Sequence, residues 1–267
     1  MHANRPNGSV TYDNSGRVVV VTGGCGGIGR AICEAILRSS ANGIVCIDLS
    51  ADLATDLPPG IEFRQADVSK EQDCRAAMEW TIQRFGAIDV LVNNAAIQPS
   101  DSYVPLDQLS SSLWDKMVAV NFSGYTFMAK YALQQMCQQQ SGVVINIASA
   151  HGHRTARGAA AYGPIKAANI MQAMQWGVEY ARHGIRVVSI SPGAIDTPMV
   201  RATLEQQGGE AELANRHPLG RLGKPEEVAH AVLWLASSDA SFITATDIDV
   251  DGGLRAFGAF AEPYPMK

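Results

Sequence analysis

A serine, a tyrosine and a lysine near the middle of the chain have side chains that could carry proton-transfer chemistry. Ser149 precedes Tyr162, and Lys166 follows the tyrosine by four positions. Residues four apart on a helix share a face, so the phenol and the ammonium can act together. A phenol has an ordinary pKa of ~10, and a fixed ammonium nearby favours its ionised form. Tyr162 could therefore act as a general acid or base toward an alcohol or carbonyl oxygen, which Ser149 could hold from its other side.

A glycine-rich segment near the N-terminus predicts a dinucleotide-binding loop. Val18 to Val21 are consecutive β-branched residues, which is typical of a strand buried on both faces of a parallel sheet. Five glycines follow, and apolar residues then recur at helical spacing. The glycines are Gly23, Gly24, Gly26, Gly27 and Gly29. Backbone without Cβ atoms can approach a pyrophosphate closely, and a helix N-terminus directs free N–H groups at it. A merely flexible loop is the alternative, but the flanking strand and helix favour the binding loop.

The next strand, over residues 43–48, ends at Asp48 and indicates which dinucleotide binds. Its carboxylate could accept hydrogen bonds from both hydroxyls of a ribose and would repel a 2′-phosphate. The glycine loop and the residues just after Asp48 offer no Arg or Lys to bind such a phosphate. We therefore expect NAD rather than NADP, with a solvated turn aspartate as the alternative.

The rest of the chain alternates strands with helices, which predicts an α/β fold. We expect a single Rossmann-type domain over residues 16–267, with a doubly wound parallel sheet of about seven strands and helices on both faces. The strands are predicted at 18–21, 43–48, 61–68, 87–97, 142–149, 185–191 and 246–253. One helix directly follows the glycine loop, and further helices are predicted at 70–85, 109–139, 160–182 and 224–237. Asn121 in the middle of a helix indicates either a kink or a positioned polar group. Residues 1–15 are expected to form a flexible tail, and 194–216 a substrate lid.

Composition excludes several classes of function. The chain has 267 residues and a net charge of −5, without a basic run, which argues against nucleic acid or an anionic membrane surface as partner. The five cysteines are scattered and form no C-x-x-C pair, so they are interpreted as reduced thiols. No apolar run reaches the ~18 residues of a membrane helix, and the N-terminus has no apolar signal core. These features predict a soluble, cytoplasmic protein.

Taken together, the motifs resemble those of the short-chain dehydrogenase/reductase family, in its single-domain branch. The resemblance covers residues 17–253. Its motifs, in family order and spacing, are Thr22-Gly23-x-x-x-Gly27-x-Gly29, Asp48, Asp67-Val68, Asn93-Asn94-Ala95, Asn121, Ser149, Tyr162-x-x-x-Lys166, Pro192-Gly193 and Asp251-Gly252-Gly253. One departure is Ala96, which stands where the family often has glycine.

The resemblance implies an oxidoreductase that moves a hydride between a nicotinamide and a secondary alcohol or ketone, and that needs no metal. It implies a catalytic tetrad: Tyr162 as acid/base, Lys166 lowering its pKa and binding the nicotinamide ribose, Ser149 orienting the substrate oxygen, and Asn121 holding a water that links Lys166 to solvent. Other residues are implied in cofactor binding. They are Gly23, Gly27, Ile28 and Gly29 for the pyrophosphate, Asp48 for the adenosine ribose, Asp67 and Val68 for the adenine, Asn94, Ala95, Pro192 and Gly193 beside the cofactor, and Ile195 and Thr197 for the carboxamide. A catalytically silent NAD-binding protein of the same fold is the alternative function.

The substrate and the assembly are less specified. We expect His151, Gln98 and Met199 to line the substrate pocket with Ser149 and Tyr162. A polyol, a sugar, a hydroxy acid and a ring diol all remain possible substrates of such a pocket. A homotetramer is expected, because the two long helices carry apolar residues on more than one face. These residues are Met117, Val120, Phe122, Tyr125, Phe127 and Met128 in the first helix, and Ile170, Met171, Met174, Trp176 and Val178 in the second.

Overall fold

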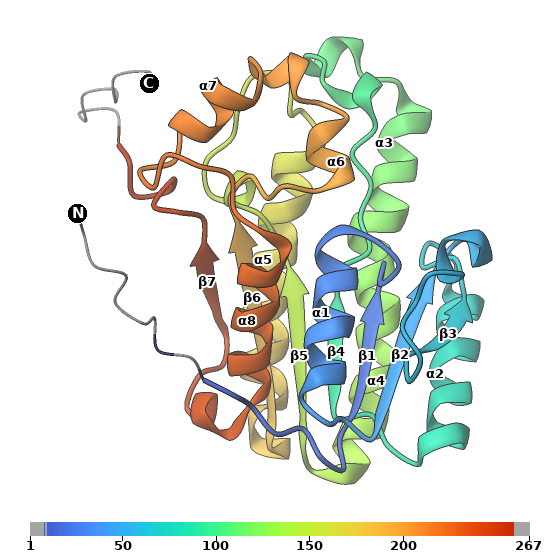
Figure 1. Cartoon of the computed structure of the whole chain (residues 1–267). Helices are drawn as coiled ribbons and strands as arrows, with labels where there is room; N and C mark the ends of the chain where they lie inside the picture. Colours follow the sequence, from blue (N-terminus) through green and yellow to red (C-terminus); the bar gives the residue numbers. More distant parts are fainter. Residues whose placement is uncertain (1–7, 9, 259–267) are drawn as a thin grey trace.

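A seven-stranded parallel sheet forms the centre of the computed structural model, which describes residue 8 and residues 10–258. The strand order is β3-β2-β1-β4-β5-β6-β7 (Figure 1). The strands are β1 (Val18–Thr22), β2 (Gly43–Asp48), β3 (Glu62–Gln65), β4 (Val90–Asn93), β5 (Gly142–Ile147), β6 (Ile185–Pro192) and β7 (Thr246–Val250). The chain builds outward from β1 to β3 and then returns to place β4 on the other side of β1. This reversal of direction is the point where open α/β sheets bind ligands.

Helices cover both faces of the sheet, as the sequence predicted. α1 (Gly27–Arg38) and α8 (Pro225–Ala236) pack on one face, and α2 (Glu71–Phe85), α4 (Gly124–Gln139) and α5 (Tyr162–Tyr180) pack on the other (Figure 1). β1 is buried along its whole length because its alternate valines enter the two cores: Val19 and Val21 on the first face, Val20 on the second. Full burial of one such side chain contributes about 1.5–3 kcal/mol. The continuous apolar sequence of β1 follows from this arrangement.

The predicted helix over 109–139 is not continuous. α3 (Ser111–Val118) and α4 are joined by a π-helical turn over Ala119–Ser123. Asn121 lies inside this turn and is fully buried. Both interpretations of Asn121 therefore apply: it marks a local interruption of the helix, and its side chain is a positioned polar group.

Residues 197–215, within the predicted substrate lid, form a segment of short helical pieces above the carboxyl ends of the strands (Figure 1). It contains α6 (Pro198–Arg201), a short 3₁₀ turn (Glu205–Gln207) and α7 (Glu210–Asn215) (Figure 1). Thr197 caps α6 by accepting a hydrogen bond from the Val200 N–H, and Pro198 occupies the first helical position.

Most of the predicted N-terminal tail lies outside the described residues, but Asn14 is buried and its side chain donates to the Ser39 hydroxyl (2.8 Å), which attaches this part of the chain to the end of α1.

Within the described part of the chain, no helix combines the length and the apolar character needed to cross a bilayer.

Candidate active site

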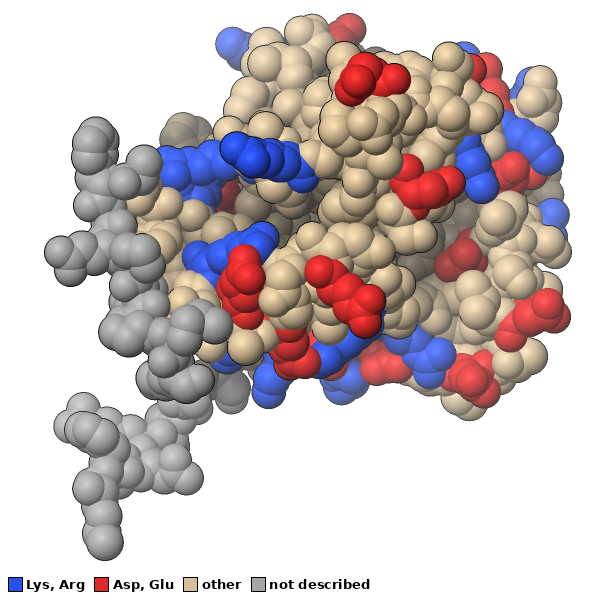
Figure 2. Space-filling view, turned by 90° about the horizontal axis from the view of Figure 1, so that it is seen from above, with Lys and Arg blue, Asp and Glu red and all other residues tan. Residues whose placement is uncertain are grey.

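A cavity of about 860 Å³ lies at the carboxyl edge of the sheet, at the point where the strand order reverses. Seen from above, the surface is hollowed here, and acidic and basic side chains are interspersed around the recess (Figure 2). The cavity is lined by residues from both halves of the sheet. Among them are Gly23, Gly27, Ile28, Asp48, Asp67, Val68, Asn94, Ala95, Ser149, Tyr162, Lys166, Pro192, Gly193, Ile195, Thr197 and Met199. Residues that are far apart in sequence thus meet in one site.

The glycine loop has the geometry of a pyrophosphate cradle. Gly26 is the N-cap of α1, and no side chain of the described residues caps this helix end. The first N–H groups of α1 are therefore available to an anion beside the cavity. A Cβ atom at Gly29 would collide with the Gly23 carbonyl and lie 2.6 Å from Asn94 Nδ2. Gly23 has φ +64°, a left-handed conformation that glycine adopts without strain.

Asn94 supports this loop from the neighbouring strand end. Its side-chain amide donates to the carbonyl of Thr22 (2.9 Å) and to that of Gly23 (3.2 Å). Its own backbone N–H donates to the Thr22 hydroxyl (2.9 Å). Asn94 therefore fixes the loop as well as lining the cavity.

Asp48 is also held in place by backbone groups. Its carboxylate accepts from the N–H of Cys25 in the glycine loop (3.0 Å) and from the N–H of Leu49 (2.8 Å). These bonds present the carboxylate at the rim of the cavity, where it could receive the hydroxyls of a ribose. The glycine cradle and this acidic group together fit a dinucleotide.

Ser149, Tyr162 and Lys166 meet in the cavity because two elements end or begin there. Ser149 lies two residues beyond the end of β5, and Tyr162 is the first residue of α5, with Lys166 one turn later. Ser149 and Tyr162 are hydrogen-bonded through their side chains. The Lys166 Nζ lies 5.6 Å from the centre of the Tyr162 ring. The predicted placement of these three side chains is therefore found in the structure.

The pKa shifts of Tyr162 and Lys166 follow their burial, and the lowering of the Tyr162 pKa by Lys166 remains a prediction. Burial raises the pKa of Tyr162 above its ordinary value, and the hydrogen bond with Ser149 only partly opposes this. Burial also lowers the pKa of Lys166 to about 7. The lysine is 1% exposed and donates to the Ile147 carbonyl (2.7 Å) and to the Tyr125 hydroxyl (3.2 Å) instead of to Tyr162. In this arrangement desolvation is the largest influence on the pKa of both groups.

Asn121 contacts the loop after β4. Its side-chain oxygen accepts from the Ile97 N–H and its amide donates to the Ile97 carbonyl, both at 2.8 Å. Its main-chain carbonyl accepts from Asn169 Nδ2 at 3.0 Å. Asn121 thus positions the loop that forms one wall of the cavity, and its expected role in holding a water remains a prediction.

The predicted substrate residues separate into two groups. Met199 lines the main cavity with Ser149 and Tyr162. His151 instead lines a second hollow of about 510 Å³, with its ring edge-on to the Tyr162 ring at 5.9 Å between centres. Gln98 is hydrogen-bonded to the side chain of Tyr103. Neither His151 nor Gln98 is among the residues that line the main cavity.

His151 and Gln98 were placed by their nearness in sequence to Ser149 and to the loop after β4, which does not determine side-chain direction. Burial, and then the charge of Arg216, lower the pKa of His151, and its buried Nδ1 has no hydrogen-bond partner among the described residues.

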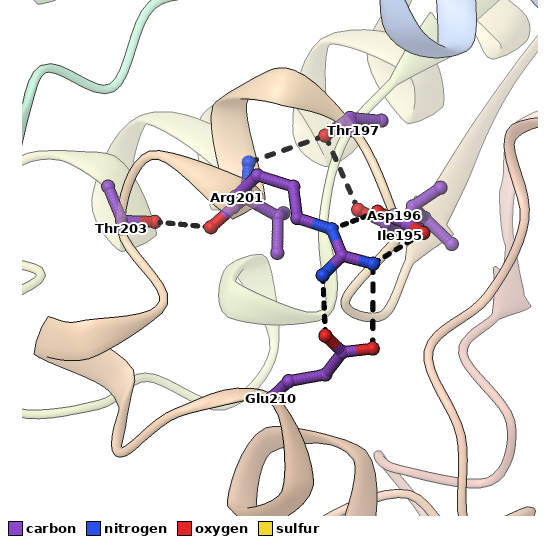
Figure 3. Close-up of polar contacts among 7 residues, drawn as sticks. Ile195, Asp196, Thr197, Arg201, Thr203 and Glu210 are labelled. Carbon is purple, nitrogen blue, oxygen red and sulfur yellow. Dashed lines mark hydrogen bonds and ion pairs between the residues drawn. The ribbon is translucent and has the colours of Figure 1, made fainter.

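Ion pairs among Asp196, Arg201 and Glu210 connect parts of the segment that lies above the cavity (Figure 3). Arg201, on α6, pairs with both carboxylate oxygens of Asp196, at 2.6 and 2.8 Å, and with Glu210 on α7. Ile195, Thr197 and Met199 on the same segment line the cavity. These ion pairs therefore link the two short helices to a wall of the site.

Sequence reasoning missed two site residues, Tyr125 and Tyr103. Tyr125 was considered only as part of an apolar helix face, although it follows Asn121 by four positions and so shares its side of the helix. The burial of its hydroxyl beside Lys166 depends on α4 packing against α5 and β5. The phenol of Tyr103 is half-buried near Tyr162 and influences it electrostatically.

Comparison with known proteins agrees with this fold. Residues 23–255 match the family profile described as enoyl-(acyl carrier protein) reductase. The short chain dehydrogenase/reductase astE of Aspergillus oryzae is 37% identical over 253 residues, which cover 91% of this chain and 96% of that relative. A 2,5-dichloro-2,5-cyclohexadiene-1,4-diol dehydrogenase of Sphingobium indicum is 34% identical, covering 91% of this chain and 99% of the relative.

A solved structure, "ElxO with NADP Bound", superposes with a TM-score of 0.83 at 29% identity, covering 90% of this chain and 99% of the other. The chain belongs to the short-chain dehydrogenase/reductase family. It is therefore an oxidoreductase of a family that binds a nicotinamide cofactor, NAD or NADP.

Proposed function

We propose that this protein is an NAD-dependent dehydrogenase/reductase that interconverts a secondary alcohol and a ketone, with Tyr162 as the general acid/base. The observation that carries this proposal is the meeting of Ser149, Tyr162 and Lys166 in the same cavity as the glycine loop and Asp48. A protein that only binds a dinucleotide has no use for a serine, a tyrosine and a lysine at the far end of the site.

The roles of the side chains follow from their positions. When bound, the nicotinamide accepts or donates the hydride. In the oxidation direction, Ser149 holds the substrate hydroxyl, and the ionised Tyr162 takes the hydroxyl proton as the hydride leaves the carbon that carries this hydroxyl. In the reduction direction, the neutral phenol of Tyr162 gives its proton to the carbonyl oxygen and becomes a phenolate. Lys166 holds a positive charge beside Tyr162 when protonated and stabilises the phenolate that appears during the reaction.

The preference for NAD rests on Asp48. Its carboxylate lines the cavity at the end of β2, and Leu49 and Ser50, which follow it, carry no positive charge. A 2′-phosphate there would face an anion without a compensating cation. The related structure with NADP bound makes this a point to measure, since members of one family differ in cofactor choice.

The catalytic proposal is tested by absorbance at 340 nm with NAD and a panel of sugars, polyols, hydroxy acids and cyclic diols. We expect NADH formation with at least one substrate class. Tyr162→Phe should lower kcat by about 10²–10⁴-fold, the usual contribution of general acid–base catalysis, while the affinity for NAD stays close to that of the parent. NAD binding without turnover of any member of the panel would favour the silent binding protein instead.

We also propose a homotetramer. Met171 and Val178 on α5 are 61% and 72% exposed, and Phe242, shortly before β7, is fully exposed. Large apolar side chains that remain exposed on packed helices are typical of surfaces buried between subunits. Other members of the predicted apolar set, such as Met117, Tyr125 and Met128, are buried inside the subunit and do not support this proposal.

A further inference from the structure

The phenol of Tyr125 lies in direct contact with the lysine of the active site. Tyr125 is 1% exposed, and its hydroxyl donates to the Ile147 carbonyl at 2.9 Å. The same hydroxyl oxygen accepts from the Lys166 Nζ at 3.2 Å, and this Nζ also donates to the Ile147 carbonyl at 2.7 Å. The three groups thus form a closed triangle beneath the cavity. It joins α4, α5 and β5.

The triangle determines where the lysine can direct its charge. An ammonium has three donors, and the triangle uses two of them. The third N–H of the ammonium is free to donate toward the cavity, where Tyr162 lies. Among the described residues, the titratable groups in contact with Lys166 are Tyr125 from α4 and Tyr162 from its own helix, and β5 contributes the Ile147 carbonyl. No carboxylate of the described residues is paired with Lys166, so neutral dipoles alone solvate its charge.

Tyr125 is itself fixed at its backbone. Its main-chain carbonyl accepts from the amide of Asn93 on β4 at 3.2 Å, and Asn93 also donates to Asn146 on β5 at 3.0 Å. Asn146 in turn donates to the main-chain carbonyl of Asn169 on α5 at 3.2 Å. These asparagines are fully buried. Tyr125 is therefore held at both ends, and its hydroxyl cannot move away from Lys166 without breaking a buried network.

We propose that Tyr125 is a positioning residue of the active site, whose hydroxyl accepts a hydrogen bond from Lys166 and favours the charged form of that lysine beside Tyr162. This inference rests on the proposed role of Tyr162 and extends it to a residue that contacts neither substrate nor cofactor. A hydrogen bond to the charged form of a group favours that form, and here it opposes the desolvation that lowers the pKa of Lys166. Loss of the hydroxyl leaves a buried N–H without a partner, so Lys166 should release its proton more readily.

The first test follows Lys166 directly and needs no turnover. Protein labelled with ¹³C at lysine Cε, loaded with NAD, is titrated by NMR in the parent and in Tyr125→Phe, with the Lys166 signal assigned by its loss in Lys166→Arg. We expect the Lys166 titration to move to lower pH by about one unit in Tyr125→Phe. Tyr131→Phe is the matched control, because this tyrosine lies on the same helix and its hydroxyl bonds Glu71 at 3.0 Å, away from the site. The control should leave the Lys166 titration unchanged.

The second test uses the pH profile of kcat/KM for alcohol oxidation. A less charged Lys166 stabilises the phenolate less, so the rising limb should move to higher pH, with about a tenfold loss of activity at neutral pH that recovers in alkali. Replacement of Tyr125 by 3-fluorotyrosine, a weaker acceptor of nearly the same shape, should give a smaller change in the same direction and is available if Tyr125→Phe does not fold.

An unmoved Lys166 titration, or a uniform loss of activity with an unchanged pH profile, would overturn the proposal and leave Tyr125 a purely structural residue. Activity retained in Tyr162→Phe would instead remove the proposed function itself, so the two failures are distinguishable.

Discussion

Lys166 has a buried amine whose charge the surrounding protein opposes, and this links its titration to stability. The ordinary pKa of lysine is 10.5, and burial lowers that of Lys166 to about 7. Between these two pH values the unfolded chain binds the proton and the native protein does not, so raising the pH favours the native state. We predict that the free energy of unfolding rises between pH 7 and pH 10 by up to about 1.4 kcal/mol per unit through this group.

Lys166→Met should abolish that dependence. Urea unfolding followed at several pH values measures the slope in both proteins. Above pH 10 the raised pKa of Tyr162 acts in the opposite direction, because the unfolded chain then loses a phenolic proton that the native protein keeps. Equal slopes in the parent and in Lys166→Met would show that Lys166 keeps its charge in the folded protein.

Asp48 is the residue on which cofactor choice is expected to depend. The double exchange Asp48→Ser, Leu49→Arg should lower the affinity for NAD and allow NADP to bind, because an anion is replaced by a cation near the position of the 2′-phosphate. Asp48→Asn is the control: it keeps the shape but removes the charge, and should weaken discrimination without creating a preference for NADP. Fluorescence titration with both dinucleotides measures the ratio of affinities. An unmodified protein that already prefers NADP would contradict this interpretation of Asp48.

At the scale of elements, the approach of α1 to the end of β4 depends on a glycine. A Cβ at Gly29 would collide with the Gly23 carbonyl and with Asn94, whereas one at Gly26 would meet nothing within 4 Å. Gly29→Ala should therefore displace the loop and lower the melting temperature, with a cost of about 1–3 kcal/mol that is typical of overpacking. Gly26→Ala should leave the melting temperature nearly unchanged but lower the affinity for NAD, because its new methyl group would enter the proposed pyrophosphate site.

Differential scanning calorimetry and dinucleotide titration of the two glycine variants separate the packing role from the binding role. Equal melting temperatures for Gly26→Ala and Gly29→Ala would argue against the close packing of α1 on the strand ends. The comparison is informative because both residues lie at the start of α1, three positions apart, and differ mainly in the space around them.

At the scale of the whole molecule, the exposed apolar side chains of α5 predict self-association. Light scattering at micromolar concentration should return about four times the 28.5 kDa of one chain. A Met171→Lys, Val178→Lys double variant should shift the mass to that of smaller species, because lysine at a buried interface carries an unpaired charge. Leu106→Lys, at a similarly exposed site elsewhere, is the control and should not change the mass. A parent protein that scatters as 28.5 kDa would reject the oligomer.

Features governed by local sequence could be predicted well. The buried run of β1, the glycine turn after it and the amphipathic start of α1 are consecutive, so their residue types alone indicate strand, turn and helix. Asp48 and Ser149 stand at the ends of strands, and parallel strands present their carboxyl ends at one edge. Tyr162 and Lys166 share a helix face through their spacing. The fold and the edge of the sheet at which the cavity lies follow from these periodicities.

Only the tertiary structure decided which polar groups bond to one another and which side chains face the cavity. The contact of Lys166 with Tyr125 spans 41 positions in sequence, and that of Asn121 with Ile97 spans 24, so neither is visible in a local pattern. The direction of His151 away from the main cavity depends on the short 3₁₀ turn after Ser149. The pKa of Lys166 depends on complete burial, which arises from the packing of α4, α5 and β5 around it. Periodicity in the sequence determines the elements, whereas hydrogen bonding and desolvation in the site depend on distances that exist only once those elements have packed.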